Sequence, residues 1–333
     1  MSKISIEHGA GGNATRDLIN QLFIKNFSNK ALNALEDAAV INAKGVKLAF
    51  STDSFVINPV FFKGGDIGNL AVCGTINDIS MMGAVPIAMS ASAIIEEGFP
   101  LKDLQKIVKS MAIAAKKANV SIVTGDTKVV KKGEADGIFI NTSAIGIIEK
   151  NIDISSKNAK IGDSVILSGN IAEHGISIML SRSDFGLKTQ IKSDCACLNG
   201  LAQNVLKTCP NVRVMRDPTR GGVCAALNEI AESSNIGIII DADAVPVSKA
   251  VASVCRILGL DPLYIANEGK MLSFQSKKDT KKALNAYKKN ALGKNAKVIG
   301  EVVAKPKGVW LKTTSGNLRK VLNSDMEQFP RIC

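Results

Sequence analysis

Runs of apolar residues with a strand-like character alternate along the chain with segments whose apolar residues recur every three to four positions. In the first half, this pattern predicts strands at 46–52, 84–95, 120–125 and 137–148. It predicts helices near 15–27, at 66–82 and at 101–118. The alternation of the two periods favours a mixed α/β (α+β) fold.

The second half continues the same alternation after a polar, aperiodic stretch at 149–160. Its predicted strands are 163–169, 236–241, 270–274, 296–303 and 308–313. Its predicted helices lie near 171–181, 194–207, 223–233 and 247–258, with a Lys-rich surface helix within 277–297.

A chain of 333 residues is too long for one ordinary core and fits two domains. We therefore expect a Gly-rich segment and helix at 1–35, a first domain at 36–150 and a second α/β domain at 151–313. The last stretch, 314–333, is polar and is expected to be a mobile tail.

Composition narrows the function classes. The net charge of +12 invites a nucleic-acid hypothesis, but the basic residues are mostly Lys and aromatic residues make up only 4% of the chain. No apolar run approaches the roughly 18 residues that span a bilayer, and no signal-peptide core opens the chain. The seven cysteines lack disulfide or zinc spacing. A cytoplasmic protein without nucleic-acid or membrane partners is expected.

Four acidic residues share similar settings among small or hydroxyl-bearing neighbours: Asp37, Asp53, Asp78 and Asp126. Each by itself is typical of a surface carboxylate or a turn. Together they suggest convergence on divalent cations, because Mg²⁺ prefers oxygen ligands while it holds phosphate oxygens. Repulsion within such a cluster would require a cation to offset it.

Further candidates lie close to these carboxylates or in the second half. Lys128 could place its charge on a transferred phosphate. Arg220 lies in DPTRGG (217–222), which opens a predicted helix and could hold an anion. Glu268, in NEGK, is a candidate base. The Gly-rich HGAGG (8–12) fits neither a P-loop nor a Rossmann fingerprint, and its His8 is equally consistent with a structural role.

The motifs GAGG, EDAAV, STDSF, GTINDISMMGA, TGDTKVV, DPTRGGV, NEGK and the final PRIC occur in an order that resembles the HypE family of hydrogenase maturation factors, the carbamoyl dehydratases. The resemblance covers essentially the whole chain. NDISMMGA and GDTKVV are similar to motifs of the wider PurM-like group, which includes aminoimidazole ribonucleotide synthetase, selenophosphate synthetase and thiamine monophosphate kinase. The terminal PRIC is what points to the dehydratases.

The resemblance implies a homodimer built on the N-terminal domain, with a C-terminal α/β domain beside it and ATP in a cleft closed by the partner subunit. It implies Mg²⁺ and phosphate contacts at Asp37, Asp53, Asp78 and Asp126. Asn77 and Thr75 would support that loop, and Lys128 would contact the phosphates. Glu36 stands where relatives often carry Asp, and we leave it outside the metal set.

For Cys333 the resemblance implies a carrier role. A carbamoyltransferase (HypF) would load its thiol as an S-carboxamide, and ATP-dependent dehydration would give a thiocyanate. Glu268 and Asp78 are the candidates for proton removal. The cyano group would pass to an iron scaffold complex, HypC–HypD, for the nickel–iron hydrogenase cofactor.

Two other functions remain open at this stage. One is a PurM-like synthetase or kinase that acts on a free small molecule. A selenophosphate synthetase would carry a reactive Cys in its N-terminal Gly-rich segment, whereas the first cysteine here is Cys73, within a predicted helix. The other is a non-enzymatic basic scaffold, which the acidic motifs disfavour.

Overall fold

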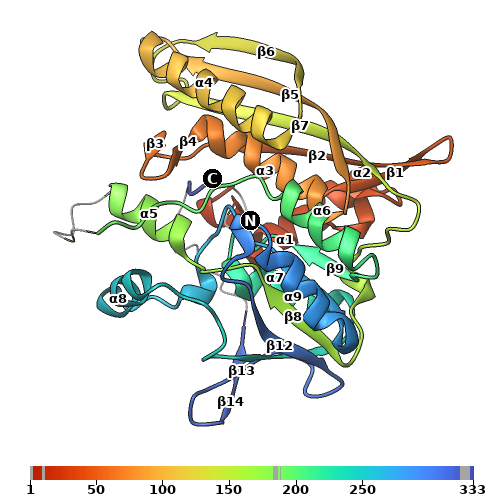
Figure 1. Cartoon of the computed structure of the whole chain (residues 1–333). Helices are drawn as coiled ribbons and strands as arrows, with labels where there is room; N and C mark the ends of the chain where they lie inside the picture. The colour runs from red at the N-terminus through yellow and green to blue at the C-terminus, as the bar shows by residue number, and fades with distance from the viewer. Residues whose placement is uncertain (1–2, 10–11, 183–186, 188, 323–330) are drawn as a thin grey trace.

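The computed structural model describes residues 3–9, 12–182, 187, 189–322 and 331–333. The described part of the chain contains two large sheets with helices packed on them, one above the other in Figure 1, and one small two-stranded sheet. Both termini are drawn near the junction of the two sheets. This arrangement confirms the mixed α/β prediction. Within the described residues, no helix is long and apolar enough to cross a membrane.

The first sheet has the strand order β1-β2-β7-β5-β6, in which β5 and β6 are parallel and the other neighbours are antiparallel. Its strands are β1 (Ala39–Ala43), β2 (Val46–Phe55), β5 (Val85–Glu96), β6 (Ile122–Val130) and β7 (Ile138–Ile148). A small hairpin pairs β3 (Phe61–Phe62) with β4 (Gly65–Asp66). β6 forms one edge of this sheet, as Figure 1 shows at the top.

Two helices cover one face of this sheet, α3 (Ile67–Met81) and α4 (Leu101–Ala118). Asp66 caps α3, because its carboxylate accepts hydrogen bonds from the amides of Gly68 and Asn69. A Cβ on Gly68 would lie 2.5 Å from the Ile107 carbonyl oxygen, so only glycine allows α4 to approach so closely. α3 is buried along nearly all its length and belongs to the core.

The second sheet has the order β14-β13-β10-β12-β8-β11-β9. Its strands are β8 (Asp163–Leu167), β9 (Val214–Arg216), β10 (Gly237–Asp241), β11 (Leu272–Ser276), β12 (Lys297–Val303), β13 (Gly308–Lys312) and β14 (Leu318–Val321). Its helices are α5 (Glu173–Arg182), α6 (Asn199–Thr208), α7 (Gly222–Ser233), α8 (Lys249–Leu258) and α9 (Thr280–Lys288). α6 contacts both α3 and α9, so the apolar core is continuous between the two halves of the chain.

Ahead of the first sheet, a continuous helical segment runs from Asn13 to Phe27, with a π-helical stretch at Ile19–Ile24 between α1 (Asn13–Leu18) and α2 (Lys25–Phe27). None of its residues is buried. The segment includes Leu22, Phe23 and Phe27, whose side chains are exposed.

The structure corrects two of the boundaries predicted from the sequence. The helix expected at 194–207 begins only at Asn199, because the Asn77 side chain accepts a hydrogen bond from the Leu198 amide and holds the preceding residues outside the helix. The tail expected from residue 314 starts with a strand, since β14 pairs with β13 and buries Val321 in the second core. Strands β1 and β9 and the β3–β4 hairpin were not predicted.

Candidate active site

The last three residues of the chain lie between the two sheets. The Val56 amide, just after β2, donates a hydrogen bond to a Cys333 main-chain oxygen at 3.1 Å. Arg331 donates to the Val56 carbonyl at 2.7 Å and forms an ion pair with Asp136. Ile332 is buried in the core. Hydrogen bonds, an ion pair and packing against the core therefore fix the last three residues of the chain.

The thiol of Cys333 is held by Arg220, which lies in the turn before α7. The guanidinium Nε donates to Cys333 Sγ at 2.9 Å, and Nη1 donates to the Gly9 carbonyl at 2.8 Å. Burial raises the pKa of the Cys333 thiol to about 12, although Arg220 acts in the opposite direction. The thiol is therefore protonated at neutral pH in this arrangement.

Carboxylates from four separate parts of the chain interact with one another here: Asp53 on β2, Asp78 on α3, Asp217 after β9, and Glu268 before β11. Ser51 donates a hydrogen bond to Asp78 Oδ2 at 2.7 Å. Glu268 and Asp53 both act electrostatically on Cys333. Tertiary structure therefore brings four of the predicted residues, Asp53, Asp78, Arg220 and Glu268, and the terminal cysteine into one site.

Positive charge offsets these buried carboxylates only in part: Arg220 acts to lower the pKa of Glu268 and Asp53, and Arg216 that of Asp217. Burial raises the pKa of Glu268 well above its usual range, and Asp217, Asp194 and Asp53 raise it further. Burial has the same effect on Asp78, with Asp53 and Asp217 adding to it. The pKa of Asp217 is raised to about 6, again mainly by burial. Buried carboxylates whose pKa values are raised in this way are typical of functional sites.

Asp37 lies at the edge of this cluster with a strong cationic partner. Arg216 Nε is 2.9 Å from Asp37 Oδ1, and the same guanidinium also pairs with Glu229 on α7. Burial nevertheless raises the pKa of Asp37. Glu36, which we left outside the metal set, accepts hydrogen bonds from Ser155 and Ser156.

A short segment before α6, residues 193–198, connects α3 to Glu268; we call it the strap. Asn77 donates from Nδ2 to the Ala196 carbonyl at 3.1 Å and accepts from the Leu198 amide at 2.7 Å. The Ala196 amide donates to the Glu268 carbonyl at 3.2 Å, and the Glu268 amide donates to Asp194 Oδ1 at 3.1 Å. Asn77 thus supports the site through the strap.

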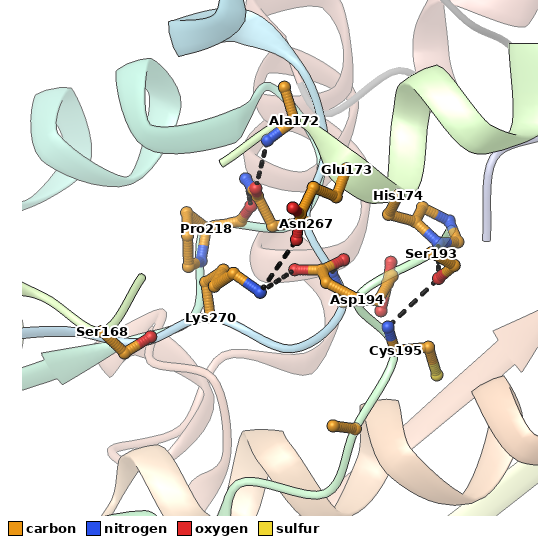
Figure 2. A network of polar contacts seen from close by, with 12 residues as sticks. Ser168, Ala172, Glu173, His174, Ser193, Asp194, Cys195, Pro218, Asn267 and Lys270 are labelled. Atoms are coloured by element: carbon orange, nitrogen blue, oxygen red, sulfur yellow. Dashed lines mark hydrogen bonds and ion pairs between the residues drawn. The ribbon is translucent and has the colours of Figure 1, made fainter. Parts of the chain in front are cut away.

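A buried lysine anchors the strap from the other side. Figure 2 shows Lys270 directed toward Asp194 and Glu173, with Nζ 3.0 Å from Asp194 Oδ2 and 3.7 Å from the nearer Glu173 oxygen. Asn267 donates to the Pro218 carbonyl and accepts from the Ala172 amide. The contacts of Asn267 and Lys270 therefore fix the two ends of the NEGK motif, and Glu268 lies between these two residues.

Gly269 is the residue of this motif that no other amino acid can replace without movement. A Cβ at this position would lie 1.9 Å from the Asp194 carbonyl oxygen. We expect Gly269→Ala to displace the strap and to destabilise the fold by about 1–3 kcal/mol, the usual cost of overpacking. Thermal unfolding measures this. Gly200→Ala is the control, because a Cβ there has nothing within 4 Å, and an equal loss in the control would contradict the steric explanation.

Among the described residues, no contact joins Asp126 or Lys128 to this cluster. Both lie on the edge strand β6, where Lys128 Nζ is 2.9 Å from Asp126 Oδ2 and both side chains are exposed. The lysine lowers the pKa of Asp126. The hydroxyls of Thr75 on α3 and Thr142 on β7 share a hydrogen bond of 2.6 Å, and both residues are fully buried, so Thr75 helps to pack α3 against β7.

A divalent cation fits the chemistry of the cluster. Asp217 Oδ2 is buried without a hydrogen-bond partner among the described residues, beside carboxylates that repel one another. Oxygen donors of this kind suit Mg²⁺, which commonly takes one or two carboxylates and completes its shell with phosphate and water. In the described part of the chain, no three His, Cys, Asp or Glu side chains form a ready-made coordination shell.

Sequence reasoning missed several of these residues. Asp217 and Arg216 stand in the segment MRDPTRGG, where only the anion-binding Arg220 was singled out. Asp194 carried no signal, because its role depends on the strap that the structure reveals. Ala10 and Gly11 of the Gly-rich motif, and Pro330 of the terminal motif, lie outside the described residues.

Comparison with known proteins defines the class to which this fold and site belong. Residues 35–148 match the N-terminal domain of AIR synthase related proteins, and residues 160–311 match the C-terminal domain of the same family. The thiamine monophosphate kinase of Aquifex aeolicus has the same fold, with a TM-score of 0.68 at 17% identity over 91% of this chain and 97% of its own.

Closer relatives specify the family. The chain is 46% identical to the carbamoyl dehydratase HypE of Cupriavidus necator over 99% of its length and 95% of that protein, and 44% identical to HypE of Escherichia coli over the full length of both. A structure of a HypE–HypF complex matches with a TM-score of 0.89 at 48% identity, over 92% of this chain and 99% of that chain. A structure of HypE in complex with ATP matches with a TM-score of 0.84 at 40% identity, over 99% and 100%. The chain belongs to the HypE carbamoyl dehydratase family.

Proposed function

We propose that this protein is an ATP-dependent carbamoyl dehydratase whose substrate is an S-carboxamide on its own Cys333, and that it supplies the cyano ligand for nickel–iron hydrogenase maturation. The observation that carries the proposal is the position of the terminal thiol. Arg220 holds Cys333 Sγ at 2.9 Å, next to the buried carboxylates of Asp53 and Glu268. A free small-molecule substrate would have no use for a tail seated in this way.

The reaction removes one water from Cys333–S–C(=O)–NH₂ to give Cys333–S–C≡N. Two N–H protons and the amide oxygen must leave. ATP, when bound with Mg²⁺, supplies the phosphoryl group that lets this oxygen depart as phosphate. The protein must orient the carboxamide, exclude water and accept protons.

We assign proton removal to Glu268. Its carboxyl group is buried and its backbone is hydrogen-bonded through the strap. Its raised pKa makes its carboxylate a stronger base than that of an ordinary glutamate. Asp78 is the second candidate for this step. Arg220 contacts the free thiol here, and after loading it would hold the carbamoyl group that the thiol carries.

We assign Asp37, Asp53 and Asp78 to Mg²⁺ and phosphate binding, with Asp217 as an additional residue. Asp217 joins the set because its unpartnered oxygen and its raised pKa both call for a cation. A cavity of about 300 Å³ beside Arg216, lined in part by Leu35 and Glu229, is the candidate site for the nucleoside.

We propose that two copies of the chain associate through the uncovered face of the first sheet. The face opposite α3 and α4 exposes apolar side chains at register positions, with Phe50 opposite Ile145 and Val85 opposite Ile147, each between 37% and 42% exposed. An apolar sheet face of this extent calls for a covering surface. A second copy would also cover β6 and could bring Asp126 and Lys128 to the partner's site.

A charge on this face is expected to break the dimer. Ile145→Asp should convert the protein from a dimer to a monomer, because burial of an unpaired carboxylate at an apolar interface is costly. Light scattering after size exclusion measures the mass. Ile257→Asp, at an exposed position on α8, is the control and should remain dimeric. A wild-type protein that is monomeric at micromolar concentration would contradict the proposal.

The partners follow from the same assignment. A carbamoyltransferase of the HypF type would load Cys333, and a HypC–HypD complex would receive the cyano group. The match to a HypE–HypF complex supports the first of these. All seven cysteines are free thiols, which fits a reducing, cytoplasmic setting.

Mass spectrometry of the C-terminal peptide tests the function. With the transferase and carbamoyl phosphate, the mass of this peptide should rise by one carbamoyl group, and ATP with Mg²⁺ should then remove one water. Cys333→Ser is the matched variant and should show neither change. An adduct that accumulates on another cysteine of this variant would overturn the proposal.

A further inference from the structure

His174, at the start of α5, is a fully buried residue to which the chemistry above assigns no role. Its Nε2 lies 2.8 Å from the Ile332 carbonyl oxygen, one residue before the carrier cysteine. Because a carbonyl only accepts hydrogen bonds, Nε2 must carry the proton and donate it. The ring therefore holds the last peptide group of the chain, between Ile332 and Cys333, directly.

The other ring nitrogen is fixed by the strap. His174 Nδ1 lies 2.8 Å from Ser193 Oγ, and the Cys195 amide donates to the same hydroxyl at 3.1 Å, as Figure 2 shows. With Nε2 protonated, Nδ1 of the neutral ring accepts from Ser193. Burial lowers the pKa of His174 and favours this neutral form. The Phe62 ring packs edge-on against the imidazole at 5.7 Å between centroids.

The same strap fixes Glu268. Three residues after Ser193, the Ala196 amide donates to the Glu268 carbonyl. One rigid segment thus sets both the imidazole that holds the tail and the backbone of the candidate base. The Ser193 amide in turn donates to the Lys63 carbonyl at 2.7 Å, which ties the strap to the first half of the chain.

We propose that His174 is a positioning residue for dehydration. Its Nε2–H bond to the Ile332 carbonyl seats the Cys333 carrier group opposite Glu268. Its hydrogen bond to Ser193 on the strap fixes the ring relative to the backbone of Glu268. The role in dehydration rests on the proposed function, whereas the seating of the tail does not.

Two substitutions separate the two ring nitrogens. His174→Gln keeps an amide N–H near the position of Nε2, so it should still hold the tail. His174→Asn places its amide near the position of Nδ1, so it keeps the strap contact and loses the bond to Ile332. A lost hydrogen bond of about 1.4 kcal/mol corresponds to a tenfold change in the seating equilibrium.

The first measurement is the rate at which iodoacetamide alkylates Cys333 in the full-length protein, followed on the C-terminal peptide. His174→Asn should be alkylated about tenfold faster than wild type, and His174→Gln within about twofold of it. Equal rates in the two variants would overturn the seating role. If both variants fail to fold, Ser193→Ala takes their place; faster alkylation supports the proposal and an unchanged rate overturns it.

The second measurement is single-turnover dehydration of the carbamoylated protein with ATP and Mg²⁺. His174→Asn should be about tenfold slower, with rescue in His174→Gln, while loading by the transferase is not slowed in either variant. Faster alkylation without slower dehydration would overturn the positioning role. If wild type itself shows no dehydration, the proposed function fails, and the alkylation contrast still decides whether His174 seats the tail.

Discussion

Replacement of Glu268 by glutamine is expected to slow dehydration by about 10²–10⁴-fold, the usual contribution of a general base. Glutamine keeps the size of the side chain and the strap contacts, which involve the Glu268 backbone. Loading of Cys333 by the transferase should not change, because that step takes place in another active site. The carbamoylated species should therefore accumulate, and mass spectrometry of the C-terminal peptide would detect it.

The pH profile provides a second readout of Glu268. Burial and three neighbouring carboxylates raise its pKa well above its usual range. The fraction of Glu268 in the ionised, basic form therefore increases at pH values above about 4.3, the ordinary pKa of a glutamate. Wild-type dehydration should accelerate with pH over this higher range. This rise of the dehydration rate with pH should be absent in Glu268→Gln. Glu301→Gln, at an exposed position on β12, is the control and should retain the wild-type profile.

A pH dependence of the dehydration rate that is unchanged in Glu268→Gln would assign the rise with pH to another ionisable group. Asp217 and Asp78 are the alternatives, because their pKa values are raised by the same burial. Repetition of the profile with Asp78→Asn would then distinguish them. A normal dehydration rate in Glu268→Gln would contradict the assignment of this residue as the base.

Asp78→Asn is expected to have opposite effects on activity and stability. Loss of a carboxylate that we assign to Mg²⁺ and phosphate binding should reduce ATP-dependent dehydration by at least about 10²-fold, comparable with the loss of one preorganised electrostatic contact. Stability in the absence of divalent cations should be equal to or greater than that of wild type. The Ser51 hydrogen bond can persist, because asparagine retains an acceptor oxygen.

The sign of the stability effect follows from proton linkage. The pKa of Asp78 is higher in the folded protein than in the unfolded chain, so the folded state binds more protons and loses stability as the pH rises above about 3.9. Asparagine does not ionise and avoids this loss. Thermal unfolding at neutral pH in EDTA, and again with Mg²⁺, measures it; Mg²⁺ should raise the melting temperature of wild type more than that of the variant.

Asn204→Asp, which adds a charge on α6 away from the cluster, is a control for non-specific effects of charge and should respond to Mg²⁺ as wild type does. A variant Asp78→Asn that loses stability in EDTA would show that the carboxylate is fully compensated without a cation. Dehydration that is insensitive to EDTA in wild type would contradict the Mg²⁺ assignment itself.

The local pattern of the sequence determined the class of structure and the main elements of the first half. Helices α3 and α4 fall within one residue of their predicted bounds, since their apolar periodicity and the Asp66 cap act over short distances. The motif order also indicated the family, which the comparisons confirm. Cys333 was singled out because the motifs upstream resemble those of enzymes that use a terminal thiol.

Only the tertiary structure decided which residues meet. It brought Arg220, Asp53 and Glu268 to the terminal thiol, with Asp78 beside Asp53. It placed Asp126 and Lys128 on an exposed edge strand instead. It also revealed His174 and the strap, whose partners lie between 19 and 158 residues apart along the chain. No local pattern encodes such contacts, because they depend on how the two sheets and their connecting segments pack against each other.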